Sequence, residues 1–256
     1  MLKNFDTNLN QGRKIKMKKI LSTAAAAGIM LLCQAAPKVV FEANFTKSLN
    51  ANASTDTISK RIPPFPVKTG KNTTFETDKE KGLIIGDEKA SAYYGIKGLL
   101  NGKSGSIELI VRNLNWEVKD LKKHLFIQAT LPGLLYFYKH SNDGVAVYFS
   151  RDDNKQKVFL GCMPSWKLDT EHHLVFTWDN GEVSLYIDGT KARSRKFEMP
   201  QEMPTRLYIG TPGKHQLNSD NTAVKMIKFY DSALSAKEVF AACKNSQPQD
   251  EDIIEE

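Results

Sequence analysis

Apolar residues recur at every second position through much of this chain, and this alternation constrains the fold more than any other feature. Such a period indicates a strand that buries one face, because successive side chains point to opposite sides. Ile107, Leu109 and Val111 share one face, whereas Glu108 and Arg112 share the other. Strands are predicted at 39–45, 83–85, 106–112, 124–130, 134–140, 145–151, 158–162, 172–178, 183–188, 207–209 and 224–229. Many short antiparallel strands predict an all-β fold, a two-sheet antiparallel sandwich or jelly roll.

The hairpin around Asn180-Gly181 has a predicted register. Asn-Gly is the favoured pair of a two-residue type I′ turn. That turn pairs Trp178 with Val183, Phe176 with Leu185, and Leu174 with Ile187. All of these residues are apolar, so this face should be buried, and a slip by one residue would mix the two faces.

A second hairpin is predicted to turn within residues 141–144. A two-residue turn there places Tyr136 and Tyr138 on the face of Val147 and Phe149. The same turn places Phe137 and Lys139 on the opposite face, with Tyr148 and Ser150. Lys139 and Tyr148 would then share a polar, solvent-facing surface.

The C-terminal region contains the one predicted helix. Ser235 and Glu238 form a capping-box pattern, which predicts a short helix over 236–243. Residues 244–256 are acidic and are expected to be disordered. Residues 46–80 are polar, include IPPFP at 62–66, and are expected to be irregular, with room for one short strand.

Positive charge is concentrated in the first 35 residues. The chain has 36 Lys and Arg against 29 Asp and Glu, and the first 35 residues hold six of the former and one of the latter. The remaining 30 basic and 28 acidic residues nearly balance. We therefore expect no nucleic-acid partner, because the basic excess belongs to the leader.

The leader, residues 1–35, has the parts of a secretory signal peptide. Two lysines follow Met17, which resembles a natural start, so residues 1–16 are an extension or precede the true start. The apolar segment 20–33 is shorter than the roughly 20 residues that span a bilayer. Small residues predict cleavage after Ala35. Secretion, or a periplasmic or cell-surface location, is expected.

Two alternatives concern the cysteines. A lipid anchor at Cys33 is disfavoured, because Leu32 precedes it where a small residue is usual. The mature chain keeps Cys162 and Cys243, which could form one disulfide in an oxidising compartment or remain two free thiols. No later run of 18 apolar residues exists, so no transmembrane segment is expected in the mature chain.

Two stretches resemble laminin-G-like domains of the concanavalin A-like lectin/glucanase superfamily. Residues 172–189, HHLVFTWDNGEVSLYIDG, are similar to the central hairpin of that family. Residues 224–239 are similar to its closing motif, and the resemblance spans roughly 37–243. Glu171 and Lys228 depart from the usual Trp and Arg of these motifs. The resemblance implies a jelly roll over 36–243 with two curved sheets, of which the concave one often carries a glycan groove.

The sequence offers little support for a catalytic function. A glycosidase needs two carboxylates that flank one bond. Residues 76–80, E-T-D-K-E, match the letters of a laminarinase-like motif. The intervening Thr77 and Lys79 are polar and could not pack in a core, so this segment is interpreted as a solvated charge run. No G-x-S-x-G sequence supports a serine nucleophile.

Metal binding is an open question at two loops. Asp152-Asp153-Asn154 and the segment 218–221 could supply oxygen ligands to Ca²⁺. His172 and His173 are adjacent on a strand and point to opposite faces, so they do not ligate one ion together. His173 is expected to form a cross-strand polar pair with Asp188.

The leading hypothesis is a non-catalytic, secreted, lectin-like module that binds a glycan or glycoconjugate. The candidate ligand-binding residues are aromatic side chains that can stack on sugars and polar ones that can bind hydroxyls: Lys139, Tyr148, Trp166, His173, Tyr186 and Asp188. Two alternatives stay open. One is a protein-interaction or adhesion domain of the cell envelope, which would bind another envelope protein. The other is a divergent glycoside hydrolase.

Overall fold

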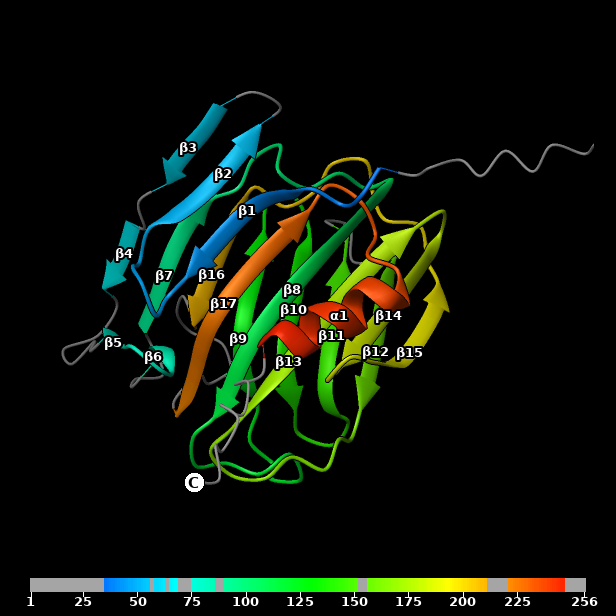
Figure 1. The fold of residues 1–256 in the computed structure, drawn as a ribbon. Helices are drawn as coiled ribbons and strands as arrows, with labels where there is room; N and C mark the ends of the chain where they lie inside the picture. Colours follow the sequence, from blue (N-terminus) through cyan, green and yellow to red (C-terminus); the bar gives the residue numbers. More distant parts are fainter. Residues whose placement is uncertain are drawn as a thin grey trace, which may run out of the picture. The chain divides into compact units, whose positions relative to one another are not determined.

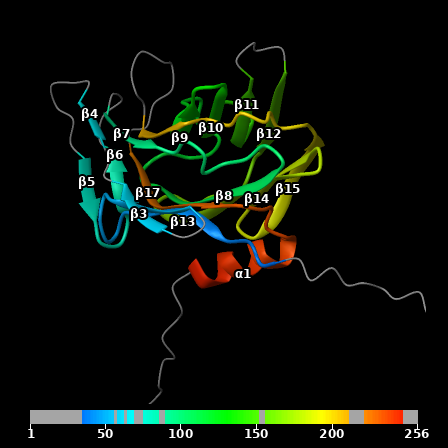
Figure 2. The ribbon, with the colours of Figure 1, turned by 90° about the horizontal axis from the view of Figure 1, so that it is seen from above.

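In the computed structural model, the strands form two stacked sheets. The structure describes residues 35–55, 58–62, 65–68, 75–85, 90–151, 156–210 and 221–246. The compact unit begins at Ala36, and every described strand and the helix lie within it. Figure 1 shows their arrangement, and Figure 2 shows one sheet above the other, with helix α1 outside the lower one.

The ten-stranded sheet, here called sheet A, carries the helix on its outer face. Its main order is β15 (Thr190–Lys196), β14 (Glu182–Ile187), β13 (Thr170–Asp179), β8 (Ser104–Asn113), β17 (Thr222–Tyr230), β1 (Val39–Asn44), β2 (Ala51–Thr55) and β3 (Ile58–Ile62). In addition, β6 (Gly82–Ile85) pairs with β17, and β5 (Phe75–Asp78) pairs with β6. All of these pairings are antiparallel.

The seven-stranded sheet is called sheet B. Its order is β12 (Lys157–Cys162), β11 (Gly144–Ser150), β10 (Leu134–His140), β9 (His124–Thr130), β16 (Arg206–Gly210), β7 (Ala90–Gly95) and β4 (Phe65–Lys68). The inner faces of the two sheets form one apolar core, to which Phe176 and Trp178 of sheet A and Phe137 and Phe149 of sheet B contribute. The two-sheet sandwich that the sequence predicts is thus confirmed.

The hairpin β13–β14 has the predicted register. Leu174 pairs with Ile187, Phe176 with Leu185, and Trp178 with Val183. The turn residues Asn180 and Gly181 have φ angles of 47° and 77°, as a type I′ turn requires. Each apolar member of these pairs is buried.

The predicted register of the hairpin β10–β11 is wrong. Its loop has three residues rather than two, because His140 pairs with Gly144, whose φ is +69°. A three-residue loop that ends at a left-handed glycine is a common alternative to the two-residue turn. The one-residue difference exchanges the faces: Tyr136 lies opposite Tyr148, and Phe137 lies opposite Val147.

Lys139 consequently lies on the inner face of sheet B, where its side chain is fully buried. Its Nζ donates hydrogen bonds to Asp120 Oδ1 at 2.8 Å, to the Lys122 carbonyl oxygen at 2.7 Å, and to the Asp120 carbonyl oxygen. A buried ammonium group is tolerated when its donors are satisfied and a carboxylate balances its charge. This ion pair anchors the loop between β8 and β9 to sheet B.

Three other parts of the chain differ from expectation. Residues 46–80 hold β2, β3, β4 and β5 rather than at most one strand. Strand β7 was not predicted, and neither was β15, whose side chains are almost all exposed. Such a polar edge strand has no alternation to detect, and its charges protect the sheet edge from pairing with another chain.

Helix α1 spans Ala236–Ser246, slightly longer than predicted, and its capping box is confirmed. Ser235 N donates to Glu238 Oε2 at 2.7 Å, and Glu238 N donates to Ser235 Oγ at 3.3 Å. The helix packs on the outer face of sheet A through Val239, which is buried with Tyr186 and Tyr230. No described helix has the length and hydrophobicity needed to cross a membrane.

The two cysteines of the domain are free thiols. Cys162 lies on β12 of sheet B, and Cys243 lies on α1, outside sheet A. The alternative of two free thiols therefore applies, rather than a disulfide.

Close packing at Gly105 generates a stability prediction. A Cβ atom at Gly105 would lie 2.3 Å from Cζ2 of the buried Trp178. Gly105→Ala should lower the free energy of unfolding by about 1–3 kcal/mol, because the indole must shift within the core. Gly95→Ala is the control, since nothing lies within 4 Å of its added Cβ. Equal urea midpoints for the two variants, followed by tryptophan fluorescence, would contradict this packing.

The buried ion pair generates a pH prediction. Burial opposes ionisation of Asp120, but hydrogen bonds from Lys139 and from the Lys122 backbone hold the pKa of its carboxyl below the ordinary value. A lowered folded pKa stabilises the protein above the unfolded pKa of about 4, and this stabilisation is lost as the pH falls through the folded pKa. Asp120→Asn should therefore cost about 1–2 kcal/mol at neutral pH. The difference from the wild type should shrink in acid.

The measurement is the free energy of unfolding in urea, compared at neutral and acidic pH. Glu202→Gln, at an exposed position, is the control and should leave the wild-type pH profile unchanged. An Asp120→Asn deficit that stays constant down to acidic pH would rule out the ion pair as its cause.

Candidate functional site

Sheet B carries an aromatic row on its outer face, the face opposite the core. Cross-strand register places one side chain from each of six neighbouring strands in this row. In the order β12, β11, β10, β9, β16 and β7, the residues are Phe159, Tyr148, Tyr136, Gln128, Tyr208 and Tyr93. Neighbouring strands lie about 4.8 Å apart, so the row extends for about 24 Å across the strands.

The rings of the row lie in two groups. Tyr136 and Tyr148 have ring centroids 6.2 Å apart with an interplanar angle of 27°. Tyr208 and Tyr93 have centroids 5.2 Å apart, also at 27°. Gln128 lies between the two groups, opposite both Tyr136 and Tyr208. The result is two stacked ring pairs with a carboxamide between them.

Side chains beside the row support the β10–β11 half of it. Tyr138 follows two residues after Tyr136 and packs edge-on to it at 5.9 Å and 66°. Leu125, Tyr138 and Ala146 form a small buried cluster beneath the row. At the other end, the Arg206 guanidinium lies 5.9 Å from the ring centroid of Tyr93. The aromatic surface is thus held by packing rather than by mobile loops.

The hydroxyls of Tyr136 and Tyr138 remain protonated at physiological pH. Burial, with the neighbouring Tyr148 as a lesser cause, raises the pKa of Tyr136. Burial also raises the pKa of Tyr138. A protonated phenol can both donate and accept a hydrogen bond. These rings therefore combine an apolar face with a neutral polar edge.

The outer face of sheet B lacks the paired carboxylates of a glycosidase within the described strands. Outward positions there hold aromatic, amide, small, aliphatic or basic side chains, and no Asp or Glu. Residues 76–78 instead lie on the edge strand β5, and the turn to β6 follows them: Asp78 Oδ1 accepts hydrogen bonds from the backbone N–H of Glu80 and Lys81 at 2.7 and 2.8 Å. That carboxylate stabilises a turn.

The structure does not bring the six predicted site residues together. Tyr148 lies in the aromatic row, whereas Lys139 is in the core. Tyr186 and His173 lie on the outer face of sheet A, where Tyr186 packs in the cluster beneath α1, and both are almost fully buried. The burial of Lys139, His173 and Tyr186 contradicts the expectation that their side chains are exposed to a ligand. Sequence alternation could not show which face the helix would cover.

The polar pairing of His173 also differs from expectation. Its Nε2 lies 2.8 Å from Glu108 Oε1, and Glu108 Oε2 accepts a hydrogen bond from the Tyr230 hydroxyl at 2.5 Å. Burial opposes ionisation, but these two hydrogen bonds hold the pKa of Glu108 below its ordinary value. Asp188 instead accepts a hydrogen bond from the His173 backbone N–H at 2.9 Å and places its other oxygen 3.0 Å from Nδ1 of His172.

Trp166 lies in the loop between β12 and β13 and is nearly buried. Its ring stacks on His172 with centroids 3.8 Å apart and an interplanar angle of 3°. The ring centroid of Trp116 lies 6.2 Å away at an interplanar angle of 42°. These contacts fasten the loop, and His172 occupies one face of the indole.

The calcium hypothesis concerns residues that the structure does not describe. Residues 152–154 and 218–220 lie outside the described ranges. Within the described ranges, no three His, Cys, Asp or Glu side chains gather so as to hold a metal ion.

The other residues of the aromatic row could not be predicted from the sequence of a single hairpin. Tyr93, Gln128, Tyr136, Phe159 and Tyr208 were not among the predicted site residues, although strand prediction placed all but Tyr93 on strands. The pairing of β9 with β16, and of β16 with β7, brings Gln128, Tyr208 and Tyr93 together. Only the strand order of the folded sheet supplies that information.

Comparisons with known proteins agree with this architecture. Residues 114–240 match a family model described as the concanavalin A-like lectin/glucanases superfamily. No curated protein matches the sequence significantly.

Several solved structures share the fold. One is domain 4 of AbnA, a GH43 extracellular arabinanase from Geobacillus stearothermophilus, in complex with arabinotriose; it is 16% identical, with a TM-score of 0.60 over 81% of this chain and 98% of that one. The botulinum neurotoxin serotype D binding domain is 10% identical, with a TM-score of 0.59 over 81% of this chain and 52% of that one. A serotype D ligand-binding domain in complex with N-acetylneuraminic acid is 10% identical, with a TM-score of 0.55 over 79% of this chain and 52% of that one.

This chain spans about half the length of the neurotoxin binding domains that it matches. At these identities the likeness concerns the fold alone. Residues 114–240 thus match the concanavalin A-like lectin/glucanase superfamily in sequence, and the solved structures share the jelly-roll fold.

Proposed function

We propose that this domain is a non-catalytic carbohydrate-binding module. The glycan lies across the strands of sheet B, along the row from Phe159 to Tyr93. The row of aromatic side chains on a face whose described strands present no carboxylate is the observation that carries this proposal. A protein-docking surface of the adhesion type would favour charged side chains at these positions.

The mechanism is stacking with hydrogen bonds at the ring edges. Sugar rings have apolar C–H faces that can cover the faces of Tyr136 and Tyr208, and aromatic contacts of this kind contribute through buried area. Gln128 can donate to one hydroxyl and accept from another, because a carboxamide holds both kinds of group. The row is long enough for a chain of several sugars, so a linear oligosaccharide fits better than a single sugar.

Two structural neighbours make saccharides a sensible set of probes. The arabinanase domain is described in complex with arabinotriose, and one neurotoxin domain in complex with N-acetylneuraminic acid. Each shallow stacking site is expected to bind weakly. Useful affinity would then come from several copies or from a linked partner, which raises the effective concentration.

We also propose export of the protein. The basic residues, the apolar segment 20–33 and the small residues before Ala36 support a cleaved signal peptide and a secreted, periplasmic or cell-surface location. An extracellular glycan or envelope component would be accessible there.

Tyrosine substitutions on sheet B should weaken glycan binding. The chain from Ala36 is screened on an array that includes arabinan oligosaccharides and sialylated glycans, and hits are quantified by calorimetry. Tyr136→Ala and Tyr208→Ala should each reduce affinity by about tenfold, because each removes a stacking surface.

Phe240→Ala is the matched control, because Phe240 is an exposed aromatic residue, 51% accessible, on α1. Its binding should equal that of the wild type. Absence of wild-type binding to every glycan would refute the proposal and favour a protein partner. Equal losses in all three variants would show that sheet B is not the site.

Export is tested by expressing the full chain in a bacterial host and measuring the mass of the recovered protein. Cleavage after Ala35 predicts a mature chain that begins at Ala36. A protein that keeps its leader, or one that begins at a lipid-modified Cys33, would contradict this processing.

A further inference from the structure

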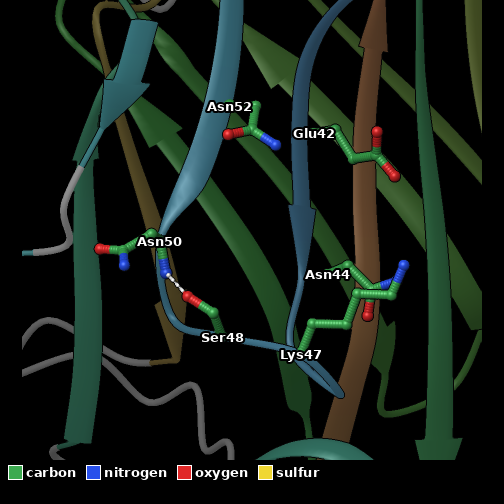
Figure 3. A pocket seen from close by; sticks show the side chains of 6 residues that line it. All are labelled: Glu42, Asn44, Lys47, Ser48, Asn50 and Asn52. Atoms are coloured by element: carbon green, nitrogen blue, oxygen red, sulfur yellow. Dashed lines mark hydrogen bonds between the residues drawn. The ribbon is translucent and has the colours of Figure 1, made fainter.

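A polar groove lies on the opposite side of the sandwich, on the part of sheet A that α1 leaves uncovered. It consists of two adjoining hollows of about 390 and 470 Å³, which share Asn44 of β1. The first hollow lies over β1, β2 and the segment between them, as Figure 3 shows. The second continues to the C-terminal end of α1, where Asn245 and Ser246 line it.

The groove is lined by a cross-strand row of polar side chains. Asn52, Glu42, Lys228 and Glu108 lie opposite one another on β2, β1, β17 and β8. Phe41, Ala43 and Ala53 of the same strands face the core, so the polar members point outward. The sheet therefore presents carboxamide, carboxylate and ammonium groups at neighbouring strand spacings of about 4.8 Å.

Two of these charged groups form no hydrogen bond or ion pair through their side chains among the described residues. Glu42 and Lys228 are direct cross-strand neighbours, yet no ion pair or hydrogen bond joins them within the described ranges. Elsewhere on the same face, Lys225 pairs with Glu171 at 2.7 Å, and Arg112 pairs with Asp169 at 2.7 Å. Close ion pairs thus form on this sheet, but none joins Glu42 to Lys228. Both charged groups are therefore available to a ligand in the hollow.

The floor of the second hollow is rigid. Glu108 is 2% exposed, and both of its carboxylate oxygens are already engaged, by His173 and by the Tyr230 hydroxyl. Asn44 Oδ1 accepts hydrogen bonds from the backbone N–H and the hydroxyl of Thr46, at 3.2 and 2.7 Å. These contacts orient the Asn44 carboxamide, whose N–H₂ group has no described partner.

We propose that this groove is a second saccharide-binding site, for a neutral sugar unit. Its lining mixes acceptors with donors, of which Glu42, Lys228 and the carboxamides of Asn44 and Asn52 are examples. A polyanion would meet Glu42, and a polycation would meet Lys228 and Lys47. A neutral ligand with several hydroxyl groups satisfies both kinds of group, because each hydroxyl donates and accepts.

The groove differs from the aromatic row in its mode of binding. Tyr230 is 9% exposed and is the aromatic side chain among its lining residues, so stacking contributes little. Hydrogen bonds from fixed polar groups are directional, which favours one sugar unit or a chain end over a sliding chain. With sites on both faces of the sandwich, a single domain could connect two glycan chains.

The test maps both faces by NMR. Amide ¹H–¹⁵N spectra of the chain from Ala36 are recorded while arabinotriose, maltotriose or cellotriose is added to millimolar concentration. We expect at least one of them to shift the amides of residues 42, 44, 52 and 228. Glu42→Gln should weaken that binding by about tenfold, because a hydrogen bond to a charged acceptor becomes a neutral one.

Glu198→Gln, at an exposed position outside the groove, is the matched control and should bind as the wild type does. Tyr136→Ala should leave the shifts at these four amides unchanged, so failure of the sheet B site can be distinguished from failure of this one. No shift with any of the three sugars would overturn the inference. Wild-type affinity in Glu42→Gln would also overturn it.

Discussion

The register of the β10–β11 hairpin determines which side chains sheet B presents to solvent. Because His140 pairs with Gly144, Tyr136 faces outward and Lys139 faces inward. A shift by one residue would bury the tyrosines and expose the lysine. The inward lysine finds Asp120 and two backbone carbonyl oxygens, so the native register satisfies a charge that would otherwise be costly to bury. The aromatic row and the buried ion pair thus depend on the same pairing.

The two outer faces of the sandwich differ because helix α1 covers part of one of them. It buries Val175, Tyr186 and Tyr230 on the outer face of sheet A. Sheet B has no such helix among the described elements (Figure 2). The aromatic residues of its row remain partly accessible. Sheet A keeps a polar margin over β1, β2 and β17 uncovered. This asymmetry leaves an aromatic surface on sheet B and a polar groove on sheet A.

Sequence alone predicts the sandwich, most strands, the capped helix and the β13–β14 register. The prediction of the β13–β14 register is correct because Asn180-Gly181 permits one tight turn and the paired residues are uniformly apolar. The β10–β11 register fails because residues 141–144 allow loops of two or three residues, and both faces of β10 carry large side chains. Asp120, the partner of Lys139, lies 19 residues away in the chain, which no local pattern indicates. Likewise, the burial of Tyr186 depends on where α1 docks.

The most direct test of the central claim is a crystal structure of the domain with an oligosaccharide selected by the array. We predict that the sugar chain runs across the strands of sheet B, with one ring against Tyr136 and another against Tyr208. A saccharide bound at the rim loops of the sandwich, with these rings uncovered, would contradict the assignment of the aromatic row as the binding surface.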